Sequence, residues 1–403
     1  MLYVEGKQNG CRNDVETAPG GDSTLLQRKP VRIALNAITS KGGARVYLWQ
    51  LASALATIDG VDVVLLVGSE EVSDIPPFLR SRVCKLPISS RRSYLQTFRQ
   101  KPIREALLRE KVDLYHIPNT MPLLRKPIPT VVTIHDMVEL RVRKYGLLRT
   151  AYRYIINCIA AHLADHVLTV SESSKRDIVH FLRIPDSKVT VIYNGVSECF
   201  RPLDRRKCKN FLESKYSISG DFLLAPGGLS RNKNVPGLLA SMRLLKERGR
   251  RESLVLLGDS NYREFKYVFS EVKQAELGRL VVFPGFVPEE DLPAFYNAAS
   301  VVVYPTLYEG FGFPALEAMA CGTPVVTSNN SSLPEVTGGA ALLVNPRNPK
   351  EIADAVQLAL SDELLHAELS SRGLLRARQF SWEKTARETL DVFLGTATRR
   401  QLK

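Results

Sequence analysis

Residues 304–322 decide the fold expected of this chain, and they read YPTLYEGFGFPALEAMACG. The β-branched run Ser300–Tyr304 that leads into them is typical of a buried strand. A loop with Gly310 and Gly312 follows, where the missing side chains let a ligand approach the backbone closely. A helix is expected to begin near Pro314, because proline is favoured in the first helical turn. The free amide groups at the start of that helix would suit a diphosphate.

The same alternation of strand and helix occurs in two series along the chain. Most of the strand candidates are continuous apolar runs, which is typical of strands covered on both faces by helices. We therefore expect an α/β protein with two doubly wound parallel sheets that face a central cleft, with the ligand site in that cleft. The expected strands are Val31–Asn36, Val61–Val67, Val112–Ile117, Thr130–His135, Val167–Ser171 and Lys188–Tyr193 in the first series, and Phe222–Ala225, Ser253–Gly258, Leu280–Pro284, Ser300–Tyr304, Thr323–Thr327 and Ala341–Val344 in the second.

The chain is expected to divide into four parts. Residues 1–30 are polar and Gly-rich, without the apolar segment of a secretory signal, and are expected to be a disordered leader. Residues 31–200 are expected to form the first domain and residues 201–379 the second, with the polar stretch Ser197–Gly220 between the two series of strands. Residues 380–403 are expected to form a terminal helix that crosses back to the N-terminal domain.

The composition narrows the classes of partner. The chain holds 55 Lys or Arg and 42 Asp or Glu, and its net charge of +13 implies an anionic partner such as a nucleic acid, a sugar nucleotide or a membrane surface. No nucleic acid is expected, because zinc-finger spacing, aromatic RNA-binding signatures and helix-turn-helix patterns are missing from the sequence. The 6 cysteines form no C-x-x-C pair, which argues against a disulfide framework or a zinc site and fits a cytoplasmic protein. No apolar run reaches the roughly 18 residues of a membrane-spanning helix.

Basic residues gather in two stretches of the first half. Arg80–Lys111 holds ten Lys or Arg against Glu105 and Glu110, and Arg141–Arg153 is a second basic stretch laced with apolar residues. Each is either a solvated helix face or a surface that meets an anionic acceptor or the headgroups of a membrane. The occurrence of two such stretches in one half favours the second interpretation, which places the protein on the inner face of a membrane as a peripheral protein.

Two glutamates flank the glycine-containing loop. Glu309 lies in the expected loop and Glu317 one turn into the expected helix, so both carboxylates can point into one cleft. A carboxylate accepts paired hydrogen bonds from vicinal hydroxyls, which suits Glu317 to a ribose and Glu309 to a hexose. The alternative is that Glu317 only adds a favourable charge to an early helical turn.

His135 follows an expected strand on the side of the cleft. In that place a histidine can donate to a sugar hydroxyl or stabilise developing charge. Alternatively, it is a hydrogen-bonded structural residue that shapes the loop together with Asp136.

An ordered set of segments resembles the family 4 retaining glycosyltransferases. Glu309 and Glu317, with seven residues between them, resemble the E-x7-E signature of that family. The other segments that carry the resemblance are SKGGAR at 40–45, TIHDM at 133–137, TVSESSK at 169–175, YNGV at 193–196, PGGLSRNKN at 226–234 and FSWE at 380–383. The resemblance covers roughly residues 31–395 and implies the GT-B fold, in which two Rossmann-like domains face a central cleft.

The resemblance implies a role for each matching position. Glu309 would contact hydroxyls of the donor sugar, Glu317 would hold the nucleotide ribose, and Lys233 would bind the diphosphate. His135 would sit beside the transferred sugar, so the implied catalytic residues are His135, Glu309 and Lys233. The further positions implied to bind the donor through their backbone are Gly42, Gly43, Gly310, Phe311, Gly312 and Phe313.

One position departs from the family pattern. Many members have Gly-Arg where this chain has Gly227-Gly228, and that arginine shares the diphosphate with the lysine. Arg231, two residues before Lys233, is a candidate to supply the missing guanidinium. The alternative is that this charge is partly absent, and a lysine does not replace the paired donors of a guanidinium.

The resemblance implies an enzyme that moves a hexose, of mannose or glucose type, with retention at the anomeric carbon. The donor would be GDP- or UDP-linked, and the acceptor a saccharide or a polyprenyl-diphosphate-linked saccharide in the synthesis of a cell-surface polysaccharide or glycan. No two Asp lie two positions apart, so the D-x-D metal motif is missing, and neither a metal nor a cofactor is expected. Two alternatives stay open: a sugar-nucleotide 2-epimerase or hydrolase of the same fold, and a catalytically silent binding subunit.

Overall fold

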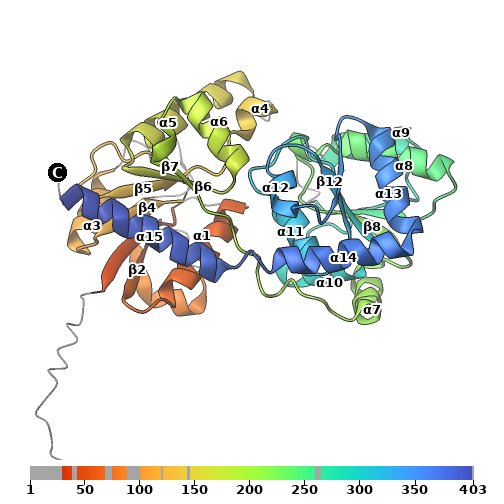
Figure 1. Ribbon diagram of the computed structural model, residues 1–403, viewed down its shortest axis with the longest axis horizontal. Coiled ribbons are helices and arrows are strands. Elements are labelled where there is room, and N and C mark those ends of the chain that lie inside the picture. Colours follow the sequence, from red (N-terminus) through yellow and green to blue (C-terminus); the bar gives the residue numbers. More distant parts are fainter. Residues whose placement is uncertain are drawn as a thin grey trace, which may run out of the picture.

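The computed structural model describes residues 30–38, 43–68, 75–88, 100–118, 121–142, 146–258 and 265–401. Two lobes lie next to one another, and each is a parallel sheet with helices on both faces (Figure 1). The N-lobe contains strands β1 to β7, and the C-lobe contains strands β8 to β13. The α/β fold with two doubly wound sheets, expected from the sequence, is confirmed. Apart from Pro30, the expected leader lies outside the described residues.

The N-lobe sheet has the strand order β3-β2-β1-β4-β5-β6-β7, and every pairing in it is parallel. Because all seven strands are parallel, their carboxyl ends lie on one edge of the sheet, where a ligand site forms in such sheets. The strands are β1 Val31–Asn36, β2 Val61–Val67, β3 Val83–Lys85, β4 Leu114–Ile117, β5 Thr130–Thr133, β6 His166–Thr169 and β7 Val189–Val191, and the helices are α1 Gly43–Ala56, η1 Pro77–Arg82, α3 Lys101–Arg109, α4 Val138–Arg141, α5 Leu147–Leu163, α6 Glu172–Leu182 and η3 Asp186–Lys188.

The C-lobe sheet has the strand order β10-β9-β8-β11-β12-β13 and is also parallel. Its strands are β8 Phe222–Ala225, β9 Ser253–Leu256, β10 Val281–Val282, β11 Val301–Tyr304, β12 Val325–Ser328 and β13 Leu342–Val344. The helices that come after β7 in the chain are α7 Arg205–Tyr216, η4 Arg231–Lys233, α8 Val235–Glu247, α9 Phe265–Gln274, η5 Glu289–Asp291, α10 Leu292–Ala298, α11 Phe313–Ala320, α12 Leu333–Thr337, α13 Pro349–Ser361, α14 Glu363–Ala377 and α15 Trp382–Gln401.

Each of the twelve strands expected from the sequence has a counterpart, but several are shorter than expected. The strand before His135 ends at Thr133, so the histidine lies in the loop beyond the sheet. The strand expected over Leu280–Pro284 is reduced to Val281–Val282. The sequence analysis missed β3, because its three residues Val-Cys-Lys are too few to show a pattern.

Burial on both faces explains why the strands are continuously apolar. Ile33 and Leu35 of β1 pack into the core beneath α1, while Ala34 packs into the core on the opposite face of the sheet. Successive side chains of a strand point to opposite faces, so a sheet between two helical layers has no polar face.

Helix α15 returns from the C-lobe and lies along the N-lobe (Figure 1). Trp382, Ala386 and Phe393 of this helix share a core with Tyr47 and Leu51 of α1. No helix of the described residues, α15 included, has both the length and the apolar character to span a bilayer.

The two segments that cross between the lobes lie against each other at Gly195. A Cβ atom on Gly195 would lie 2.2 Å from the backbone nitrogen of Trp382. Beside it, the Thr385 hydroxyl donates to the Tyr193 carbonyl at 2.8 Å, and the Val196 amide donates to the Phe380 carbonyl. Only glycine at position 195 allows the backbones to approach this closely.

We expect Gly195→Ala to lower the free energy of unfolding by more than about 2 kcal/mol, because two backbone segments would have to move apart. Gly395→Ala is the control. It lies on an exposed position of α15 where a Cβ meets nothing within 4 Å, and it should stabilise by up to about 1 kcal/mol. Denaturant titration measures both, and equal stabilities for the two variants would contradict the close crossing.

Candidate functional site

The loop after β11 touches the N-lobe at Gly310. A Cβ on this glycine would lie 2.7 Å from Oδ2 of Asp136 and 2.9 Å from the carbonyl oxygen of His135. The loop that bears Glu309 is therefore packed directly against the loop that follows β5. Two segments predicted to belong to one site, 174 residues apart in the sequence, meet at this contact.

Two serines at the start of α6 bind the same glycine from the N-lobe. The Ser171 hydroxyl donates to the Gly310 carbonyl at 2.7 Å, and the Ser174 hydroxyl donates to the same oxygen at 3.2 Å. Ser171 is also the N-cap of α6, because its hydroxyl accepts the Ser174 amide at 3.1 Å. Both serines are fully buried, so the capped end of α6 fixes the position of Gly310.

A second attachment joins the lobes through Glu335 of α12. Its carboxylate accepts the backbone amides of Glu172 and Ser173 at 2.9 and 3.0 Å, and the Tyr193 hydroxyl at 3.1 Å. The first amides of a helix have no partner within the helix and attract an anion. The C-lobe thus supplies the anion that binds the N-terminus of α6.

Lys233 and Glu309 form an ion pair on the C-lobe side of the site. Lys233 Nζ lies 2.9 Å from Oε1 of Glu309 and donates to the Tyr304 hydroxyl at 2.6 Å. The side chains of Lys233 and Glu309 are only 15% and 13% exposed, and Asn232 donates to the same Glu309 oxygen at 3.1 Å. An ammonium has three protons, and among the described residues Lys233 donates to Tyr304 and Glu309. The third proton is therefore left for a phosphate oxygen.

Gly227 leaves space for this lysine. A Cβ on Gly227 would lie 3.2 Å from Lys233 Nζ, and the glycine has φ +96°, which side chains rarely allow. The first glycine of the Gly227-Gly228 pair is thus needed to accommodate Lys233. Arg231 lies in the same short helix η4, and its side chain is exposed.

Glu317 lies in α11 beside Tyr296 and Tyr304. The Tyr296 hydroxyl donates to Oε2 of Glu317 at 2.6 Å. Burial raises the pKa of Glu317 to about 7, against the opposing effects of the Tyr296 hydrogen bond and the Lys233 charge. Burial is the main cause that raises the pKa of Tyr304, and the charges of Glu309 and Glu317 raise it further. The two carboxylates therefore lie within electrostatic reach of one tyrosine.

His135 is held by the N-lobe in a neutral form. Its Nε2 lies 2.9 Å from the carbonyl oxygen of Pro118, and its ring packs edge-on against Tyr47 with centroids 4.9 Å apart. Burial lowers the pKa of His135 to about 4. A carbonyl only accepts, so Nε2 carries the proton, and Nδ1 is an acceptor suited to a substrate hydroxyl.

The remaining predicted positions contribute backbone. Gly312 has φ +104° and begins α11 as its N-cap. The Phe311 ring packs against Phe380, and the Phe313 ring stacks on Trp382 with centroids 6.2 Å apart. The Phe311 ring is buried and the Phe313 ring is partly buried, so the role predicted for both residues depends on their backbone amides. Gly43 is the first residue of α1, and Gly42 lies outside the described residues.

Sequence reasoning missed the contacts between the lobes. It gave no role to Ser171, Ser174 or Glu335, although the serine-rich segment 171–174 is a typical N-cap signal. Nothing in the spacing of Glu335 indicates that its partner is a helix 163 residues earlier. Within the described part of the chain, no three His, Cys, Asp or Glu side chains are grouped as metal ligands would be.

Comparison with known proteins identifies the family. A model described as "Glycosyltransferase Family 4" matches residues 41–198, and one described as "Glycosyl transferases group 1" matches residues 215–376. O-antigen chain mannosyltransferase B of Escherichia coli is 34% identical over 298 residues, which are 72% of this chain and 77% of that protein. The chain belongs to glycosyltransferase family 4.

Other similar proteins support the same family and fold for this glycosyltransferase. The serotype-specific mannosyltransferase WbdA of Escherichia coli is 30% identical over 279 residues, which are 68% of this chain and 34% of that longer protein. Sucrose-phosphate synthase of Thermosynechococcus elongatus has the same fold, with a TM-score of 0.77, 23% identity and coverage of 92% of this chain and 99% of that one. Anabaena Alr3699/HepE, solved in complex with UDP and glucose, has a TM-score of 0.70 at 18% identity, over 91% and 100% of the two chains. The GT-B fold implied by the sequence motifs is confirmed.

We expect Gly310→Ala to reduce glycosyl transfer at least about 100-fold, because the new methyl group would push the Glu309 loop away from the N-lobe. Initial rates measure the loss, and small-angle scattering should show a larger radius of gyration. Gly278→Ala is the control, since a Cβ there meets nothing within 4 Å. Wild-type rates and dimensions for Gly310→Ala would contradict the contact.

The raised pKa of Glu317 predicts a pH dependence of stability. The folded state keeps a proton on Glu317 up to a pH of about 7, whereas the unfolded chain loses it near the ordinary value of 4.5. This contribution to stability is therefore present at low pH and is lost as the pH rises to about 7, a change of roughly 2–3 kcal/mol.

Glu317→Gln should remove that dependence, while Glu213→Gln, at an exposed position of α7, should keep it. Denaturant titrations between about pH 5 and 8 measure the slope for each protein. An identical slope in wild type and Glu317→Gln would show that this carboxyl does not titrate differently in the two states.

Proposed function

We propose that this glycosyltransferase moves a mannosyl residue, with retention, from a nucleotide diphosphate sugar to a saccharide acceptor in the synthesis of a cell-surface polysaccharide. The observation that carries the proposal is the largely buried cluster of Lys233, Glu309 and Tyr304, with Glu317 close by. Mannose is the favoured sugar because the curated relatives with 30% identity or more include O-antigen and serotype-specific mannosyltransferases of Escherichia coli. The nucleotide is GDP or UDP.

The donor would lie along the C-lobe, and different residues would bind its ribose, diphosphate and hexose. Glu317 would accept hydrogen bonds from the ribose hydroxyls, and Glu309 would accept them from the hexose. The remaining proton of Lys233, the exposed guanidinium of Arg231 and the first amides of α11 would bind the diphosphate. The complex of Anabaena Alr3699/HepE with UDP and glucose supports a nucleotide sugar as the donor of a protein with this fold.

We propose that catalysis depends on stabilising the leaving diphosphate. Preorganised cationic and amide donors are most effective where negative charge develops and water is excluded. The described N-lobe offers no carboxylate that we assign as a nucleophile, so we favour front-face attack through an oxocarbenium-like state. The acceptor hydroxyl would lose its proton to the departing phosphate oxygen, while Nδ1 of His135 accepts a hydrogen bond from the sugar. No divalent metal takes part in this scheme.

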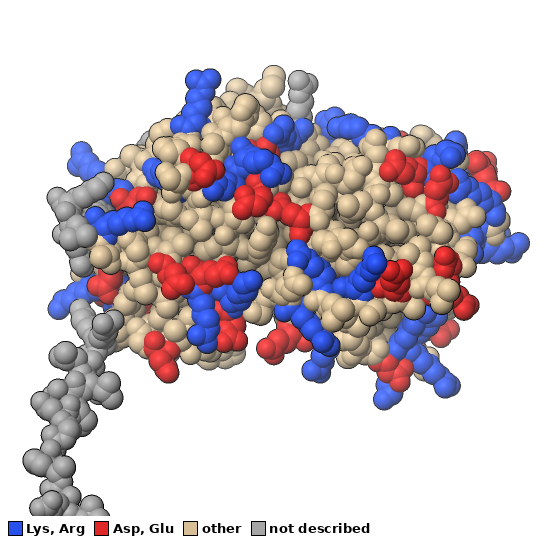
Figure 2. All heavy atoms as spheres, in the orientation of Figure 1, with Lys and Arg blue, Asp and Glu red and all other residues tan. Residues whose placement is uncertain are grey.

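The identity of the acceptor and the location of the enzyme in the cell are also proposals. A polyprenyl-diphosphate-linked saccharide would bring the enzyme to the inner face of a membrane, with Arg80–Lys111 toward anionic headgroups. In the described part of that stretch Arg82 pairs with Asp62 and Arg109 with Glu110. Figure 2 shows Lys and Arg spread over both lobes with Asp and Glu between them. On the face of the molecule shown there, the basic residues are therefore not gathered in one patch.

A transfer assay tests the proposal. The protein is incubated with GDP-mannose or UDP-glucose and a mannose-containing oligosaccharide, and the product is analysed by mass spectrometry and proton NMR. We expect an α-linked product with one of the two donors, at a rate that EDTA does not change. Glu309→Gln should lower the rate at least about 100-fold and still bind the nucleoside diphosphate.

Three results would contradict this assignment. Release of free sugar without an acceptor product indicates a hydrolase, and a changed sugar nucleotide indicates an epimerase. Nucleotide binding without any turnover indicates a silent binding subunit. If Glu309→Gln loses nucleotide affinity instead of turnover, the roles of the two glutamates are exchanged.

A further inference from the structure

A hollow of about 540 Å³ lies between the lobes, and none of the residues predicted to bind the donor lines it. Helix α4 and helix α6 form its N-lobe wall, and the loops after β11 and β12 form its C-lobe wall. Its charged and polar lining includes Arg141, Arg176, Asp177 and His180 from the first wall and Tyr308 and Ser331 from the second.

The single acidic group among these side chains is neutralised within the protein. Arg141 Nε donates to both carboxylate oxygens of Asp177 at 3.0 and 3.1 Å. The Tyr308 hydroxyl donates to Oδ2 of Asp177 at 2.7 Å from the other lobe. The side chain of Asp177 is 5% exposed, so it presents almost no negative charge to the hollow.

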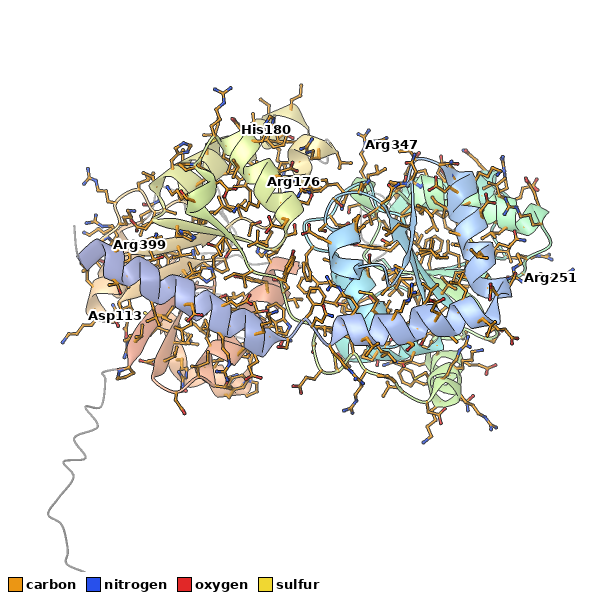
Figure 3. All side chains as sticks on the ribbon, in the orientation of Figure 1. Asp113, Arg176, His180, Arg251, Arg347 and Arg399 are labelled. Carbon is orange, nitrogen blue, oxygen red and sulfur yellow. The ribbon has the colours of Figure 1, made fainter. Side chains whose placement is uncertain are left out.

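Two basic side chains of α6 line the hollow. Arg176 and His180 are four residues apart on this helix and therefore lie on one face of it. Both are exposed, and Figure 3 labels them on α6, which borders the C-lobe. Neither has an ion pair within the described residues, so the Arg176 guanidinium is left to bind an anion, with the imidazole N–H of His180 as a second donor.

The opposite wall belongs to the loop that carries Glu309. Tyr308 is its immediate neighbour in the chain, and the Glu309 amide donates to the Ser331 hydroxyl at 3.1 Å. A molecule in the hollow would therefore lie against the segment that carries Glu309, although the Glu309 side chain itself does not line the hollow. An acceptor that receives the donor sugar has to approach this segment.

We propose that the hollow is an acceptor subsite that binds a phosphate group of the acceptor through Arg176 and His180. Arg141 also lines the hollow, but its charge is paired with that of Asp177. The ligand class is a saccharide that carries a phosphate or diphosphate, either free or linked to a lipid. The inference rests on the proposed glycosyl transfer and specifies its acceptor.

The test compares mannosides without a phosphate, with a free phosphate and with a lipid-linked diphosphate. Wild type, Arg176→Ala/His180→Ala and the control Arg206→Ala are assayed with methyl α-mannoside, mannose 1-phosphate and a polyprenyl-diphosphate-linked mannoside in detergent. Arg206 is an exposed arginine on α7 of the C-lobe. We expect KM for the phosphorylated acceptors to rise at least tenfold in the double variant, with kcat within a factor of two and KM for the donor unchanged. Methyl α-mannoside and Arg206→Ala should show no change.

The two phosphate sources give different outcomes. A rise in KM with both phosphorylated acceptors shows that the subsite binds the phosphate itself. A rise with the lipid-linked acceptor alone assigns the subsite to the diphosphate of a lipid carrier. An unchanged KM for both, or an equal rise with methyl α-mannoside, overturns the subsite.

A binding measurement separates this proposal from the proposed function. Mannose 1-phosphate is titrated into protein saturated with nucleoside diphosphate, so that the donor site is occupied. Binding that the double variant loses supports the subsite even if no transfer is detected, in which case the proposed function fails alone. Transfer that proceeds while neither binding nor KM depends on Arg176 and His180 leaves the proposed function standing and removes the subsite.

Discussion

The close packing of Gly310 against the His135 carbonyl and the Asp136 side chain is the contact on which the site depends. Because the glycine has no side chain, its loop lies within van der Waals distance of the N-lobe, and buried hydroxyls of Ser171 and Ser174 bind its carbonyl. The position of Glu309, one residue earlier, is therefore set by both lobes together. If Glu309 binds the donor as proposed, its binding geometry depends on the contact between the lobes.

The charges of the site are expensive to bury, and the structure offsets that cost locally. Lys233 and Glu309 neutralise one another, and Asn232 and Tyr304 satisfy further hydrogen bonds of the pair. Among the residues that the structure describes, no cation is bonded to Glu317, and burial raises its pKa. A buried carboxyl with a raised pKa is often part of a functional site, and Glu317 is one of the two glutamates that the sequence motifs indicated.

The elements of both sheets were predictable because their signals are local. A continuous apolar run such as Val61–Val67 identifies a strand buried on both faces, and the spacing of Glu309 and Glu317 follows from one loop and one helix. Strand β3 was missed because three residues carry no periodicity. The Glu335 contact with α6 and the Asp177–Tyr308 bond were missed for another reason. They join residues more than 130 positions apart, and only the arrangement of the two lobes brings them together.

A crystal structure of the protein with an unreactive analogue of GDP-mannose or UDP-glucose tests the central claim most directly. The account predicts ribose hydroxyls on Glu317, the diphosphate within hydrogen-bond distance of Lys233, and hexose hydroxyls on Glu309, with Gly310 still against His135. A nucleotide sugar bound elsewhere, or bound with both carboxylates free of its hydroxyls, would contradict it.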